Sequence, residues 1–111
     1  MGTATQSTLP LPVIFERLRR SPAEVAEFCR RHRVRRMSLF GSVVRDDFEP
    51  ASDIDVVVEF EPGYRPGFAF FGMAEQLETF FGRRVDLLTA DGLGRIGHQV
   101  RCEARVIYEA G

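Results

Sequence analysis

The chain has 111 residues, a formal net charge of -1 and 28% charged residues. This length suits one domain, and the near-neutral charge excludes a strong overall attraction to nucleic acid or to an anionic membrane. All 15 basic residues are arginines, which excludes every mechanism that needs a catalytic lysine.

The N-terminus has no basic residue before its short apolar patch, so it does not resemble a signal peptide. No stretch approaches the length that spans a membrane. Cys29 and Cys102 lie far apart and form no CxxC motif, which favours a reducing compartment over a disulfide framework. We therefore expect a cytoplasmic protein with a flexible tail at 1–10 and a single domain at 11–111.

The first predicted helix begins at Ser21. Ser21 is a suitable N-cap, Pro22 suits the first helical position, and Glu24 completes a capping box. The apolar segment at 34–40 predicts a strand that ends at a glycine, and a short helical turn is expected over 42–45.

The clearest strand is "DIDVVVEFEP", which alternates with a period of two and stops at a Pro-Gly pair. One face would carry Ile54, Val56, Val58 and Phe60, and the other Asp53, Asp55, Val57 and Glu59. An amphipathic helix is predicted over 68–81, closed by Gly82, with these residues inward: Phe70, Met73, Ala74, Leu77, Phe80 and Phe81. A strand at 83–90, a helix at 93–104 and a strand at 105–110 complete an α/β pattern.

Two aspartates stand where a buried strand begins, and this position needs an explanation. Asp53 and Asp55 project from one face of an extended chain, with α-carbons roughly 6.5–7 Å apart. Like charges at this spacing repel unless a cation lies between them, and Mg²⁺ prefers hard carboxylate ligands. Asp86 interrupts the next apolar strand in the same way and is the best third ligand for a two-metal site. For Asp53 and Asp55 alone, a merely polar strand entrance is the alternative.

Gly41 and Ser42 follow the first apolar strand and precede a predicted helical turn. Glycine lets the backbone approach a ligand closely, and a hydroxyl with free N–H groups at a helix start favours an anion. A phosphate cradle and a metal platform are thus both indicated within fifteen residues. For Gly-Ser alone, an N-cap after a strand is the better explanation.

Together, Gly41-Ser42, ten intervening residues and Asp53-x-Asp55 resemble the signature of the polymerase-beta-like nucleotidyltransferases. The wording "SDIDVVVEF", the later "GRRVDLLT" and the closing "RVIYEAG" resemble the minimal nucleotidyltransferases, which are often encoded beside a HEPN-domain partner. The resemblance covers roughly residues 22–110. It implies the polymerase-beta-like fold, a small mixed sheet flanked by helices.

The resemblance also implies a reaction, the transfer of AMP from ATP to a hydroxyl. Asp53, Asp55 and Asp86 would be catalytic and would bind two Mg²⁺ ions, with Asp86 helping to deprotonate the acceptor. Gly41, Ser42 and Arg45 would bind the nucleotide. This chain departs from the family's common "GSxARG" wording, since Val44 and Asp46 replace alanine and glycine.

For the minimal proteins, the resemblance implies an antitoxin that attaches AMP to a tyrosine of a HEPN toxin. The short chain leaves no room for a separate acceptor-binding domain, so a partner is expected in a homo- or hetero-oligomer. Two alternatives stay open: an antitoxin that neutralises its partner by contact alone, and a small-molecule nucleotidyltransferase of the aminoglycoside type. The arginine run at 30–36 is interpreted as a solvated helix end, so no direct nucleic-acid binding is expected.

Overall fold

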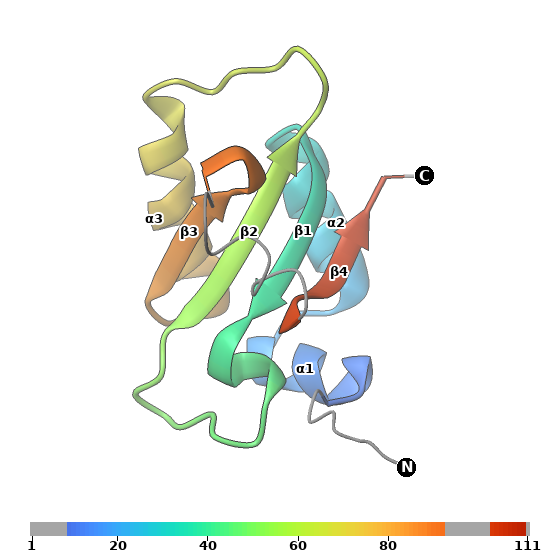
Figure 1. Cartoon of the computed structure of the whole chain (residues 1–111), viewed down its shortest axis with the longest axis vertical. Helices are drawn as coiled ribbons and strands as arrows, with labels where there is room; N and C mark the ends of the chain where they lie inside the picture. The colour runs from blue at the N-terminus through green and yellow to red at the C-terminus, as the bar shows by residue number, and fades with distance from the viewer. Residues whose placement is uncertain (1–8, 93–102, 111) are drawn as a thin grey trace.

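The computed structural model describes residues 9–92 and 103–110, which form one mixed four-stranded sheet with helices packed against it (Figure 1). The strand order is β3-β2-β1-β4. β1 runs antiparallel to both β2 and β4, whereas β2 and β3 run parallel. The four strands are Val34–Phe40 (β1), Ile54–Phe60 (β2), Val85–Thr89 (β3) and Arg105–Glu109 (β4). The predicted small mixed sheet flanked by helices is confirmed.

The helix α1 (Leu11–Leu18) is absent from the elements that the sequence predicts. It buries Ile14 and Leu18 completely, and these residues have the i, i+4 spacing of one helix face. Pro10 and Pro12 disguise the helix in the sequence, because proline normally breaks helices. Both prolines lie at the helix start, where the lost N–H has no partner to lose.

The expected flexible tail at 1–10 is described only at its last two residues, since 1–8 lie outside the described part of the chain. The backbone N–H of Leu9 donates to the carbonyl of Val44 over 3.0 Å. The side chain of Leu9 also packs against the core. The boundary between tail and domain stays a prediction.

The helix α2 (Pro22–Arg31) begins with the predicted capping box. The Glu24 N–H donates to Oγ of Ser21 (3.1 Å), and the Ser21 N–H donates to the Glu24 carboxylate (2.9 Å). Burial raises the pKa of the Cys29 thiol to about 12. This thiol therefore stays protonated and unreactive at neutral pH.

The helix α3 (Ala69–Phe81) ends at Gly82, whose left-handed conformation (φ 72°) is the C-cap that the sequence predicts. Of its predicted inward residues, Met73, Leu77 and Phe81 are buried, and the remaining three are half-buried. Phe68 and Phe71 are exposed. No helix within the described residues is long and apolar enough to cross a membrane.

The sheet has a core face and a second face. The core face packs against the helices through one cluster that includes Ile54, Val56 and Val58, as the period-two pattern predicts. On the second face, Val57 packs with partly buried neighbours that include Phe40 and Leu88. This second face also carries the acidic residues, because Asp55 shares the side of Val57.

Two short 3₁₀ turns follow strands. Residues Gly41–Val44 form η2 after β1, one residue earlier than the predicted turn at 42–45, and Ala90–Gly92 form η3 after β3. The predicted helix at 93–104 lies outside the described residues, apart from Glu103 and Ala104. The loop at 45–53 and the loop at 61–68 lie at opposite ends of the sheet (Figure 1).

Candidate active site

The pairing of β2 with β3 brings two of the predicted carboxylates together. In this parallel ladder Asp55 lies directly opposite Asp86, and neighbouring strands are about 4.8 Å apart. Asp55 is half-buried, whereas Asp86 is exposed. The pairing therefore places one partly desolvated carboxylate beside one that solvent reaches.

The electrostatics of Asp55 reflect this crowding. Its pKa is raised from 3.8 to about 6, first by burial, then by the charge of Asp86 and a hydrogen bond with it, and also by the charge of Asp53. The cation of Arg45 acts in the opposite direction. Asp55 and Asp86 therefore lie close enough to share a proton, which is the situation that a metal ion would relieve.

Asp53 lies just outside β2, at the residue before the strand begins. Its carboxylate is 40% exposed and lies 4.0 Å from Nε of Arg84, a side chain that is itself 85% exposed. The backbone N–H of the next residue, Ile54, donates to the Arg84 carbonyl, which fixes the entrance of the strand. Asp53 thus approaches the pair from the strand entrance with the exposed cation of Arg84 beside it.

Within residues 9–92 and 103–110, no three acidic, histidine or cysteine side chains converge closely enough to form a complete metal-ligand group. The chemistry of the donor set nevertheless fits Mg²⁺, because Asp55 and Asp86 offer hard oxygen ligands that repel each other without a cation. The role of all three aspartates as metal ligands stays a prediction.

Gly41 connects the predicted phosphate turn to the carboxylates. Phe40 pairs with Asp55 across β1 and β2, so the residue after Phe40 lies against the Asp55 side chain. Gly41 has φ of +78°, and a β-carbon added there would overlap Oδ2 of Asp55. Glycine is therefore favoured at this position, because a side chain here would meet both the backbone strain and the carboxylate.

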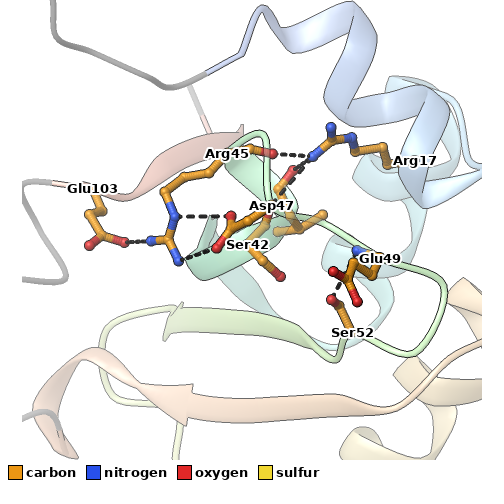
Figure 2. Close-up of polar contacts among 8 residues, drawn as sticks. Arg17, Ser42, Arg45, Asp47, Glu49, Ser52 and Glu103 are labelled. Carbon is orange, nitrogen blue, oxygen red and sulfur yellow. Dashed lines mark hydrogen bonds and ion pairs between the residues drawn. The ribbon is translucent and has the colours of Figure 1, made fainter.

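Arg45 is held by two carboxylates (Figure 2). Its guanidinium donates to both oxygens of Asp47 (3.3 and 3.4 Å) and to Glu103 (2.8 Å). The hydrogen bond with Asp47 is the main reason why the pKa of Arg45 is raised, and the same bond lowers the pKa of Asp47. A nucleotide phosphate would have to compete with these carboxylates, so the predicted role of Arg45 is untested.

Three further residues contact the motif without any sequence signal that predicts them. Arg17 of α1 donates to carbonyl oxygens of η2, Arg83 donates to carbonyl oxygens of the 45–53 loop, and Glu103 binds Arg45. Carbonyl acceptors are present at every residue. A sequence therefore carries no mark of which arginine will use them.

A separate pocket of about 690 Å³ lies at the far end of β2 and β3, beside the loop at 61–67 and the start of α3. Its lining includes none of the predicted site residues. The residues that the sequence predicts for the site therefore lie at the other end of these strands, where Asp55, Asp86 and η2 meet.

Comparison with known proteins identifies the family of the chain. Residues 23–108 match the family described as "Nucleotidyltransferase domain". The chain therefore belongs to the nucleotidyltransferase domain family. It is a nucleotidyltransferase. Its similarity to the solved structure of a candidate minimal nucleotidyltransferase assigns it to the minimal members of that family.

Among its relatives is MJ1379 of Methanocaldococcus jannaschii, named as a candidate protein adenylyltransferase, which is 36% identical over 78% of this chain and 95% of the relative. A solved structure of a candidate minimal nucleotidyltransferase is 36% identical with a TM-score of 0.68, covering 82% of this chain and 93% of that one. A third match shares the fold at 20% identity, with a TM-score of 0.59 over 80% of this chain and 70% of the other. It comes from a complex of the tri-AMPylated Shewanella oneidensis HEPN toxin with its MNT antitoxin.

Proposed function

We propose that this protein transfers AMP from ATP to a hydroxyl group, a tyrosine, of a HEPN toxin partner and thereby acts as an antitoxin. The observation that carries the proposal is the register of β2 and β3, which sets Asp55 opposite Asp86 beside the turn at Gly41. The relative named as a candidate protein adenylyltransferase and the AMPylated toxin complex support this choice of reaction and acceptor.

The proposed reaction depends on Mg²⁺, held by Asp53, Asp55 and Asp86. When bound, the metal would supply neutralisation of the triphosphate charge and polarisation of the α-phosphate. The raised pKa of Asp55 supports this assignment, because a carboxylate pair that favours a shared proton gains stability when a divalent cation replaces that proton.

The side chains have separate roles in the proposed step. Gly41 and Ser42 bind the β- and γ-phosphates, and Gly41 lets the turn lie against Asp55. Asp86, which solvent and a partner can reach, accepts the proton of the tyrosine hydroxyl. The tyrosine oxygen then bonds to the α-phosphorus, and pyrophosphate leaves with the electrons of the broken bond.

The proposal is tested with labelled ATP, Mg²⁺ and a HEPN-domain protein from the same organism, a neighbouring gene being the first candidate. We expect label on a tyrosine of the partner, and a loss of at least about 100-fold in transfer for Asp86→Asn or Asp55→Asn. The matched control is Asp91→Asn, an exposed aspartate just past the other end of β3, which should transfer AMP at the wild-type rate.

The same variants separate catalysis from masking by contact. If Asp55→Asn still binds the partner in a pull-down but no longer neutralises it, AMP transfer carries the antitoxin effect. Equal neutralisation by wild type and by Asp55→Asn would reject the proposal in favour of an antitoxin that acts by contact.

A further inference from the structure

Two arginines from distant parts of the sequence meet over one aromatic ring in the loop of the motif. The guanidinium carbon of Arg83 lies 4.3 Å from the ring centre of Phe48, and that of Arg17 lies 5.0 Å from it. Both distances fall within the range of cation–π attraction. Phe48 is half-buried and packs against the core, and it stands between the Gly-Ser turn and Asp53.

Arg17 also fixes the Gly-Ser turn directly. Its Nη1 group lies within hydrogen-bonding distance of three carbonyl oxygens, those of Ser42 (3.3 Å), Val43 (3.0 Å) and Arg45 (2.6 Å). Figure 2 shows this side chain reaching from α1 to the turn. One guanidinium group thereby contacts two carbonyls within η2 and a third just after it.

Arg83 fixes the other end of the same loop. Its Nη1 group donates to the carbonyls of Glu49 (3.1 Å) and Ser52 (2.8 Å), immediately before Asp53. The loop closes on itself between these two residues, because the Ser52 N–H donates to the Glu49 carbonyl and the Glu49 N–H donates to the Ser52 hydroxyl. Figure 2 shows the second of these bonds.

We infer that Arg17, Phe48 and Arg83 are positioning residues that set the spacing between the phosphate turn and the carboxylates. This inference rests on the proposed function, because it assigns the spacing to the transfer of AMP. Arg17 holds the turn, Arg83 holds the approach to Asp53, and the Phe48 ring joins the two cations into one unit. Reacting groups held in this way gain rate from correct geometry, and a displacement of about 1 Å can cost on the order of 100-fold.

The chain contains a matched control for this arrangement. Arg20 lies 4.5 Å from the ring centre of Phe80 and donates through Nε to the Phe80 carbonyl (2.7 Å). Phe80 is half-buried and packs against the same core as Phe48. This Arg–Phe pair therefore has the same chemistry but joins the connection between α1 and α2 to α3, away from the motif.

The experiment compares Phe48→Leu with Phe80→Leu in AMP transfer by the full chain. Phe48→Leu should lower kcat by on the order of 10- to 100-fold while the KM for ATP changes less than about threefold. Both substitutions should lower Tm by similar amounts, because each removes a half-buried ring from the same core. Phe80→Leu should nevertheless leave kcat within about twofold of wild type. Phe48→Tyr should restore kcat, because it keeps the ring.

Lysine at position 17 or 83 should not replace arginine, since an ammonium group lacks the planar fork that both stacks and donates. We expect Arg17→Lys and Arg83→Lys to lower kcat by about the same factor as Phe48→Leu. Equal kcat values for Phe48→Leu and Phe80→Leu would overturn the inference, as would full activity of both lysine variants.

A readout without catalysis separates this inference from the proposed function. Amide hydrogen exchange over 41–53 should accelerate by at least about tenfold in Phe48→Leu and stay unchanged in Phe80→Leu. If wild type transfers no AMP, the proposed function fails, and this exchange still decides whether the loop is held as described. Unchanged exchange in Phe48→Leu would overturn the positioning role whatever the activity.

Discussion

The α-carbon of Gly41 lies against the carboxylate of Asp55, so the turn of the predicted phosphate site and the half-buried acid of the predicted metal site are in direct contact. The contact arises from the antiparallel pairing of β1 with β2, in which Phe40 faces Asp55. The two halves of the sequence motif are therefore one structural unit, and a change in one half is expected to disturb the other.

Gly41→Ala is expected to damage both halves. The left-handed backbone alone costs roughly 1 kcal/mol for a residue with a side chain, and the overlap with Asp55 adds a displacement of the carboxylate. Gly63→Ala is the matched control, because Gly63 has φ of +82° with nothing within 4 Å of the added carbon. Chemical denaturation and AMP transfer should both show a larger loss for Gly41→Ala, and equal losses would contradict the contact.

The raised pKa of Asp55 predicts a pH dependence of stability in the absence of divalent cations. The unfolded chain ionises near 3.8 and the folded chain near about 6, so the stability from the protonated carboxyl is present below pH 3.8 and is lost as the pH rises through about 6. Asp55→Asn should therefore be more stable than wild type at neutral pH. After allowance for solvent screening, its free energy of unfolding should be about 1 kcal/mol higher. The difference should vanish near pH 4.

Asp47→Asn provides a control of opposite sign for that measurement. The pKa of Asp47 is lowered from 3.8 by its hydrogen bond with Arg45. Its ionised form therefore stabilises the fold at pH values above 3.8, and this stability is lost as the pH falls further. Denaturation curves should show Asp55→Asn gaining stability over wild type as the pH rises from about 4 to 8, whereas Asp47→Asn should lose stability relative to wild type at lower pH, as the pH rises through the acid range up to the unfolded pKa of 3.8. The same sign for both variants would contradict the assigned charges.

Mg²⁺ should stabilise the wild-type protein in a thermal shift assay. A ligand at tenfold excess over its Kd raises the unfolding free energy by about 1.4 kcal/mol. Asp86→Asn should lose most of this response, because it removes one of the two facing carboxylates that would bind the ion. Asp91→Asn should keep the response. An equal response from Asp86→Asn and wild type would place the ion elsewhere.

Nucleotide affinity should respond to the contact between Asp47 and Arg45. Asp47→Asn releases part of the Arg45 fork and should lower the Kd for ATP about two- to fivefold, a small factor because exposed ion pairs are weak. Asp46→Asn makes the same change of charge at an exposed residue that none of the Arg45 contacts involves. Equal Kd values for the two variants, measured by calorimetry, would assign the effect to net charge alone.

Local patterns in the sequence predict most of the fold. The capping box at Ser21, the period of two in β2 and the C-cap at Gly82 are short-range signals, and each corresponds to the expected element. The strand order and the facing of Asp55 with Asp86 are long-range properties that no local pattern encodes. The motif could indicate that these carboxylates belong together, but not that their strands run parallel.

The elements that the sequence does not predict have a common cause. The start of α1 carries two prolines, and its stability comes from the burial of Ile14 and Leu18 against the rest of the chain. Arg17 and Arg83 act through backbone carbonyls, which leave no residue-specific signature. Tertiary contact, rather than local preference, therefore determines this part of the site.

Arg17 precedes residue 23, where the family match begins, yet it holds the Gly-Ser turn of that family's motif. The segment that matches the family is thus shorter than the segment that holds the Gly-Ser turn in place, because the latter includes α1. A chimera that joined residues 23–108 to a foreign N-terminal segment would retain every motif residue and still lack the cation that gathers the turn. A chimera that is meant to keep this turn in place should therefore include α1 together with residues 23–108.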